Sequence, residues 1–232
     1  MSRLWPVRRT GLPFFTRPSN FLLMQVNIDT QAELGLSVTE ATTRAQIIGA
    51  TIATIADHGY ARTTFARIKE RAGLSSTRLI SYHFTNKAGL MQAVLSTVSE
   101  TKSEYLRERS AGVDPADRPG NLRAYIETSV AFLRDYPQCE RVLVEMAAHA
   151  DDRDGWAMTG VMVGQLRTGA LQRQLEQGRK EGAFGDIAPE IVALSIAQAI
   201  DGVAAAYAAD PSIDLDRYGR ELADLFARAT AR

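Results

Sequence analysis

The fold is decided by residues 59–87, which read GYARTTFARIKERAGLSSTRLISYHFTNK. Gly73 separates two short segments in which apolar residues recur at the three- and four-residue spacing of a helix. Hydroxyl residues that can cap a helix N-terminus precede both segments. These candidates are Thr63 or Thr64 for the first segment and Ser75 or Ser76 for the second. The stretch therefore predicts two short helices joined by a tight turn.

A helix-turn-helix of this kind places its second helix in the major groove of DNA while the first helix crosses the phosphate backbone. Short hydroxyl side chains and the planar fork of Arg78 suit base edges, whereas Lys87 suits a phosphate. The predicted DNA contacts are Arg44, Thr63, Thr64, Ser75, Ser76, Thr77, Arg78, Ser81, Tyr82, His83 and Lys87. A solvated helical hairpin would carry similar residues, so the motif alone leaves both interpretations open.

The rest of the sequence is also helical in character, because Ala, Leu, Glu, Arg and Gln dominate and no strand-like alternation occurs. Gly59 and Pro137 end predicted helices, and Pro189 suits the first turn of another. Besides the two short helices and a long one after Asn86, the predicted helices span residues 43–58, 122–136, 139–149, 156–181, 190–209 and 215–229. The predicted fold class is therefore all-α.

Charge is divided along the chain, although the 27 basic and 27 acidic residues cancel overall. Residues 41–99 carry seven basic and two acidic side chains, whereas residues 100–232 carry 16 basic and 22 acidic ones. A basic head on an acidic body suits a module that docks one face on the phosphates of DNA. An ordinary solvated helix surface can also be locally basic, so the charge supports the motif without deciding its role.

Several classes of function find no support in the sequence. The single Cys139 excludes a disulfide within one chain and suits a reducing cytoplasm, and the three histidines show no metal-ligand spacing. No nucleophile elbow or phosphate-binding glycine loop occurs, so we expect no enzyme, no cofactor and no metal site. The most apolar window, residues 191–209, contains Ser195, Gln198 and Asp201, which favours a buried helix over a membrane span.

Residues 1–40 are predicted to be a disordered tail, because prolines and Arg17 interrupt their apolar stretches. Two alternatives stay open. Translation could begin at Met24, or a basic arm could contact DNA through Arg3, Arg8, Arg9 and Arg17.

A wider window adds the motifs G-Y-A-x-T-T-x-x-x-I, A-G-L-S and Y-H-F-x-x-K in register. Over about residues 41–100 the chain thereby resembles the TetR family of transcriptional regulators. The matching positions are Gly59, Tyr60, Thr63, Thr64, Ile68, Ala72, Gly73, Ser75, Tyr82, His83, Phe84, Lys87 and Leu90. The resemblance implies an all-α homodimer in which an N-terminal three-helix DNA-binding domain is joined by a fourth helix to a larger ligand-binding and dimerisation domain. It also implies that the protein represses transcription by binding a palindromic operator, and that a small molecule releases it from this operator.

The same resemblance implies that the last two helices pair with their copies in a second chain. Their apolar stripes are Ile196, Ile200, Val203, Ala204 and Tyr207 in one helix and Leu222, Leu225 and Phe226 in the other. These stripes could equally be monomer core.

An effector pocket is predicted between residues 122 and 181, where aromatic and thioether side chains gather. Its candidate lining is Tyr125, Phe132, Met146, His149, Trp156, Met162 and Leu166. Ordinary core packing would use the same residue types. The chemical identity of the effector does not follow from the sequence.

Two positions depart from the family pattern. Lys69 stands where the family usually has Ala, and we expect its aliphatic stem to pack while the ammonium reaches the surface. Ten residues, in place of the usual nine, separate Gly73 from Phe84. Counting from Gly73 makes Leu79 the core residue of the recognition helix, whereas counting from Phe84 makes it Ile80. One extra residue turns a helix by about 100°, so the two counts direct different side chains at DNA.

The sequence thus predicts a DNA-binding transcriptional regulator, with a tail (1–40), a helix-turn-helix domain (41–101) and an effector-binding and dimerisation domain (102–232). Its expected partners are operator DNA, a second copy of the chain and a small molecule, with no membrane. Two alternatives remain: a structural DNA binder without an effector, and an enzyme with a helical interaction head.

Overall fold

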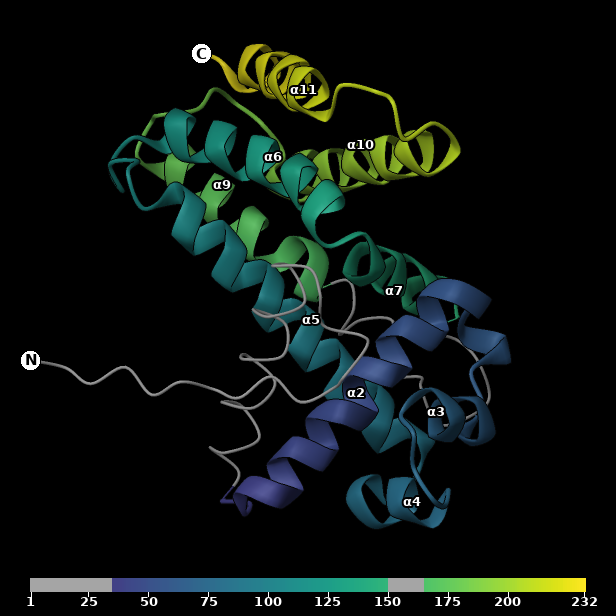
Figure 1. The fold of residues 1–232 in the computed structure, drawn as a ribbon. Coiled ribbons are helices and arrows are strands. Elements are labelled where there is room, and N and C mark those ends of the chain that lie inside the picture. The colour runs from purple at the N-terminus through teal and green to yellow at the C-terminus, as the bar shows by residue number, and fades with distance from the viewer. Residues whose placement is uncertain (1–34, 150–164) are drawn as a thin grey trace, which may run out of the picture.

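A computed structural model describes residues 35–149 and 165–232, and these residues form helices and turns without a strand (Figure 1). The predicted Trp156 and Met162 lie outside the described residues. The N-terminal part, which is predicted to bind DNA and is called the DNA-binding end below, contains α2 (Val38–His58), the short 3₁₀ turn η1 (Tyr60–Arg62), α3 (Phe65–Arg71) and α4 (Arg78–Phe84). The long α5 (Lys87–Ser110) leads to α6 (Arg118–Asp135), α7 (Pro137–Ala148), the π-helical turn η2 (Gln165–Gly169), α9 (Ala170–Lys180), α10 (Pro189–Ala209) and α11 (Leu215–Thr230). The predicted all-α fold class is confirmed.

Helix α2 begins five residues earlier than predicted, because its true N-cap is Ser37. The backbone N–H of Glu40 donates to Ser37 Oγ, and the Glu40 carboxylate accepts from the backbone N–H of Ser37. This capping box stabilises the first turn, so residues 38–40 belong to the helix and not to the tail. The sequence signal for this start is the S-x-x-E spacing of Ser37 and Glu40. The regular apolar pattern begins further along the helix and by itself predicts a later start.

The recognition-helix register is settled by burial. Ile80 is fully buried, whereas Leu79 is half-buried. The count from Phe84 is therefore the correct one, and the extra residue lies in the turn before α4. Helix α4 accordingly begins at Arg78 and not at Ser75 or Ser76, although Ser76 Oγ still accepts from the backbone N–H of Arg78 at 3.1 Å.

The turn after α4 is tight and strained. Thr85 has φ 54° and ψ −52°, and it is the single non-glycine residue with positive φ in the described part of the chain. The backbone N–H of Asn86 bonds back to the carbonyl of Phe84, as in a γ-turn. Asn86 then caps α5 by accepting from the N–H of Gly89 at 2.9 Å. This turn redirects the chain from the recognition helix into the long helix that leads to the body.

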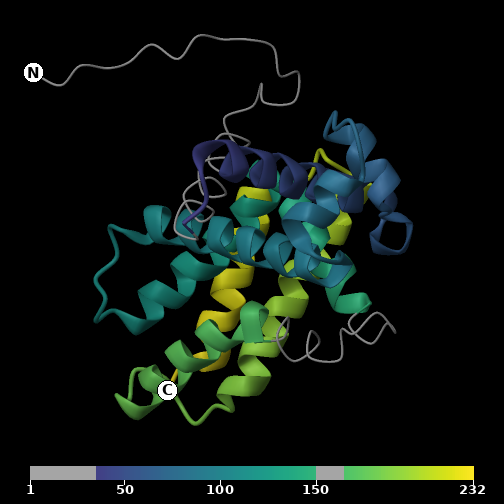
Figure 2. The ribbon, with the colours of Figure 1, turned by 90° about the horizontal axis from the view of Figure 1, so that it is seen from below.

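Two apolar cores hold the molecule together. The first joins Ile52 of α2 and Ile80 of α4 to Val94 of α5, and it continues into α6 and α7 through Phe132 and Met146. The second lies among α6, α9, α10 and α11. Because α5, α6 and α7 contribute to the first core, the DNA-binding end is packed onto the body instead of hanging from a linker (Figures 1 and 2).

Within the body, α6 runs along α11 (Figure 1). Gly219 lies at this contact, where a Cβ would be 3.4 Å from the Cα of Glu127. Arg134 of α6 also pairs with Asp216 at 3.2 Å. The last helix is thereby fixed to the body.

The apolar stripes of α10 and α11 turn out to be mostly monomer core. Ile196, Ile200, Val203 and Phe226 are buried, and Ala204, Tyr207 and Leu222 are partly buried against them. Leu225 alone among the named residues is an exposed large apolar side chain. A different set projects outward: Ile191 and Leu194 from α10, with Tyr218 and Leu225 from α11, each 40% to 61% exposed. We call these four residues the outer apolar face.

Helix α10 is, by length and composition alone, apolar enough to cross a membrane. Core helices of globular proteins meet the same criterion. Here one side of α10 lies in the second core, and Asp201 on it pairs with Arg167 of η2. These contacts bury one side of α10, but only 28% of its apolar window is buried, so the helix is less buried than predicted.

Candidate DNA-binding site

The exposed side of α4 and the turn before it carry the residues that could read bases. Ser75, Thr77, Arg78, Ser81 and Tyr82 are all exposed. Two residues turn a helix by about 200°, so Arg78 and Tyr82 both point away from the core residue Ile80 that lies between them. We call these five residues the recognition face. It brings together most of the predicted base contacts.

Arg44 positions the recognition helix from α2. Its guanidinium donates to the backbone carbonyl of His83 and lies 4.2 Å from the centre of the Phe84 ring. Burial lowers its pKa from the ordinary value near 12.5, which leaves it charged at neutral pH. Because Arg44 is half-buried, its role in the structure is to hold the C-terminal end of α4.

His83 contributes no positive charge at neutral pH. Burial lowers the pKa of its imidazole below the usual 6.5, and the neighbouring Arg44 adds to this effect more than Glu40 opposes it. The ring lies edge-on to exposed Tyr82, with 5.1 Å between centroids. His83 therefore supports Tyr82 from the half-buried side of the helix.

The two predicted phosphate-binding threonines differ in accessibility. Thr63 is 1% exposed, and its hydroxyl donates to the carbonyl of Gly59 at 2.9 Å. Its side chain is thus committed to the turn before α3, and we leave it out of the proposed interface. Thr64 is exposed and caps α3 by accepting from the backbone N–H of Arg67 at 3.3 Å. No hydrogen bond donated by this hydroxyl is found among the described residues, so it can donate to a phosphate.

Lys87 lies at the first position of α5, with its ammonium 4.5 Å from the centre of the Tyr60 ring. The ring is buried and also contacts the imidazole of His149 at 5.3 Å between centroids. Tyr60 therefore fixes the direction of the lysine stem. A lysine held in this way presents its charge at a defined place beside the recognition helix.

Three contacts that place this site were missing from the sequence-based prediction. Glu40 caps α2, and Gln46 donates to the carbonyl of Ala72 at 2.6 Å, which ties α2 to the end of α3. Glu145 of α7 accepts from the backbone N–H of Tyr60 at 2.9 Å. Only Glu40 carried a local signal, since the other two contacts join residues far apart in sequence.

The described residues predicted to line an effector pocket are divided between the two cores, although Tyr125 and Phe132 share one face of α6. Met146 belongs to the first core, and His149 contacts Tyr60, so both lie against the DNA-binding end. Phe132 is buried between α5 and Tyr136, whereas half-buried Tyr125 packs against the second core. Leu166 falls in η2, and nothing further is established for its side chain. As a set, the prediction remains untested.

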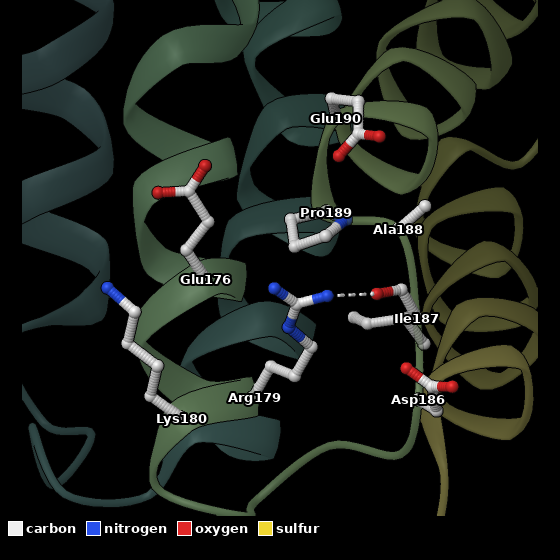
Figure 3. Close-up of a pocket in the computed structure, with 8 residues that line it drawn as sticks. All are labelled: Glu176, Arg179, Lys180, Asp186, Ile187, Ala188, Pro189 and Glu190. Atoms are coloured by element: carbon white, nitrogen blue, oxygen red, sulfur yellow. Dashed lines mark hydrogen bonds between the residues drawn. The ribbon is translucent and has the colours of Figure 1, made fainter.

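A surface pocket of about 590 Å³ lies elsewhere in the body, where α9 turns into α10 (Figure 3). Arg179 crosses it and donates to the carbonyl of Ile187 at 3.0 Å. Its lining is Glu176, Arg179, Lys180, Asp186, Ile187, Ala188, Pro189 and Glu190. None of the predicted effector residues is among them, and the mixed charges give this pocket no preference for one ligand class.

Comparisons with known proteins agree with this geometry. The family model "Bacterial regulatory proteins, tetR family" matches residues 47–94. The transcriptional regulator TtgR of Pseudomonas putida is 43% identical over 81 residues, which are 35% of this chain and 38% of that protein. The regulator BetI of Paraburkholderia xenovorans is 38% identical over 85 residues, or 36% and 42% of the two chains. The matched stretch thus spans well under half of these relatives.

Solved structures extend the likeness to the body. A TetR family transcription regulator from Marinobacter aquaeolei superposes with a TM-score of 0.67 over 82% of this chain and 95% of that one, at 18% identity. A second structure is NalD, described as the secondary repressor of the MexAB-OprM multidrug efflux pump in Pseudomonas aeruginosa. It superposes with a TM-score of 0.63 over 84% of this chain and 98% of that one, at 20% identity. At these identities the likeness concerns the fold.

Proposed function

Because its helix-turn-helix segment belongs to the TetR family, we propose that this chain is a cytoplasmic transcriptional regulator that binds a palindromic operator as a homodimer. The observation that carries the proposal is the recognition face, five exposed residues on α4 and in the turn before it, on a helix whose opposite side is anchored by Ile80. Thr64 and Lys87 flank this face and would contact phosphates. The similarity to named regulators over the same stretch supports this function.

The second copy would dock through the outer apolar face. Ile191, Leu194, Tyr218 and Leu225 lie on adjacent C-terminal helices and are exposed in the single chain. Exposed large apolar side chains on neighbouring helices are candidates for an association surface. In a two-fold dimer, the two recognition helices would have to lie about 34 Å apart to enter successive major grooves.

The body would bind a small molecule that weakens operator binding, so that the chain acts as a repressor. Such a ligand acts by its higher affinity for a form of the dimer whose recognition helices are wrongly spaced. The contact between Glu145 of α7 and Tyr60 supports this coupling, because a shift of α7 would be felt directly at the DNA-binding end.

A selection of random DNA bound by the full-length protein tests the proposal. We expect an enriched inverted repeat and an affinity that falls steeply with salt concentration. Recovery of no enriched sequence, together with salt-independent binding, would refute it.

Replacing Arg78 by Ala should relax the sequence preference at one base pair in each half-site. Arg78 points away from the core, and a bidentate arginine contact discriminates by about 1–3 kcal/mol. The same selection, repeated with the variant, measures the effect. Ser103→Ala, a change of an exposed residue on α5, serves as the control, and an unchanged preference in R78A would remove Arg78 from the base contacts.

Replacing Lys87 by Ala should weaken binding to every sequence alike, by roughly tenfold at low salt, because a phosphate contact carries no sequence information. The slope of log affinity against log salt should become shallower by about one for each subunit. Titrations of the operator and of a scrambled duplex at several salt concentrations give both quantities. A changed base preference would contradict the phosphate role.

A further inference from the structure

A buried ion pair lies between α5 and α7, away from the DNA-binding site. Lys102 Nζ donates to Glu140 Oε2 at 3.0 Å, and the two side chains are only 18% and 4% exposed. The ammonium also lies 5.7 Å from the centre of the Phe132 ring. Burying two opposite charges is costly unless the hydrogen bonds of both groups are satisfied. The three N–H donors of Lys102 make only one hydrogen bond to the described residues.

A second, partly buried pair lies close by. Arg167 of η2 pairs with Asp201 of α10, and their side chains are 15% and 21% exposed. The raised pKa of Lys102 reflects opposing influences: burial lowers it, whereas Glu140 and Tyr125 raise it, with Arg167 as a weaker opposing charge. Tyr125 and Arg167 are thus within electrostatic reach of Lys102. Two cations and two carboxylates make this region neutral overall.

Ser129 is the independent observation that points to a ligand. It is fully buried on α6, and its hydroxyl has no hydrogen-bond partner among the described residues. It follows Tyr125 by four residues and precedes Phe132 by three, so the three side chains share one face of the helix. Tyr125 and Phe132 both lie near Lys102. Ser129 therefore lies on the face of α6 that carries the two residues near the Lys102 ammonium.

We propose that Lys102, Ser129, Tyr125, Phe132 and Glu140 form a ligand subsite in the body, which takes an uncharged molecule through an oxygen acceptor such as a ketone carbonyl. This inference rests on the proposed function, in which the body binds an effector. The unused donors of Lys102 and the Ser129 hydroxyl call for an acceptor. Because Glu140 already balances Lys102, a carboxylate or an amine would bring an uncompensated charge into the interior. The rings of Tyr125 and Phe132 suit the apolar part of such a molecule.

Two sets of probes with matched carbon skeletons test the proposal on the full-length protein. The first set is acetophenone, benzoate and benzylamine, and the second is 2-octanone, octanoate and octylamine. Dissociation constants come from ligand-observed NMR titrations up to 10 mM. We expect a ketone to bind at least about tenfold more tightly than its charged counterparts. Ser129→Ala should weaken ketone binding about tenfold, the loss expected for one buried hydrogen bond. Exposed Ser103→Ala on α5 is the matched control and should leave binding unchanged.

The inference is overturned by any of three results: neither ketone binds, a charged probe binds more tightly than its ketone, or S129A binds ketone like the wild type. A rise in the melting temperature of S129A without any ketone binding would identify the Ser129 position as a site for water only, which also overturns it. Operator binding by the same preparations is measured in parallel. If the ketones fail these tests while the protein still binds its operator, the subsite alone is rejected. If the protein does not bind an operator, the proposed function is rejected.

Discussion

Replacing Leu194 of α10 and Leu225 of α11 together by Asp is expected to convert the proposed dimer into monomers and to lower operator affinity at least about a hundredfold. Both side chains are about half exposed in the single chain, and they belong to the outer apolar face. Charges placed there would have to be buried at the interface without partners. A monomer binds only one half-site. In a dimer, binding of the first subunit holds the second subunit at a high effective concentration near the other half-site, and a monomer lacks this gain in affinity.

Sedimentation velocity measures the association state, and a fluorescence titration of operator DNA measures the affinity. Val144→Asp is the matched control, because Val144 is also a large exposed apolar residue, 40% exposed, but lies on α7. The control should remain dimeric. A double variant that stays dimeric and binds the operator normally would place the interface elsewhere.

Replacing Lys102 by Met is expected to lower the free energy of unfolding by about 3–5 kcal/mol, since it leaves the Glu140 carboxylate buried without its partner. The carboxylate is only 4% exposed, so water cannot replace the lost ammonium without rearrangement. The second change Glu140→Leu, added to Lys102→Met, should recover most of the loss, because two apolar side chains can replace a buried pair at little cost. Urea unfolding followed by circular dichroism gives the values.

An exposed ion pair serves as the control for the buried pair of Lys102 and Glu140. Arg134 and Asp216 lie 3.2 Å apart with side chains 44% and 60% exposed, so Arg134→Met should cost less than about 1 kcal/mol. The interpretation of Lys102 fails if K102M unfolds within 1 kcal/mol of the wild type, or if the double variant is no more stable than K102M.

The helix-turn-helix could be predicted in detail because its determinants are local. Gly73 marks the turn, Thr64 caps α3, and the apolar spacing identifies the helices without reference to the rest of the chain. The start of α2 was predicted wrongly, although the capping box of Ser37 and Glu40 was legible in the sequence. This capping box precedes the regular apolar stripe, so the stripe alone does not mark the start of the helix.

The facing of the recognition helix was undecided in the sequence because two adjacent apolar residues, Leu79 and Ile80, could each fill the core. Packing decided for Ile80, since Phe84 and Arg44 fix the end of α4 against α2. The same limit applied to Thr63, whose polar side chain suggested a surface role. Its hydroxyl is instead buried against the carbonyl of Gly59.

The sequence by itself determined the helical class, the helix-turn-helix and the separation of a basic head from an acidic body. These properties depend on residue spacing and composition along short stretches. The tertiary structure alone decided which apolar stripe is core and which is surface, as for Ile200 and Leu225. It also brought Lys102 of α5 and Glu140 of α7 together in one ion pair. Such proximity depends on how helices cross in space, a property that no local pattern encodes.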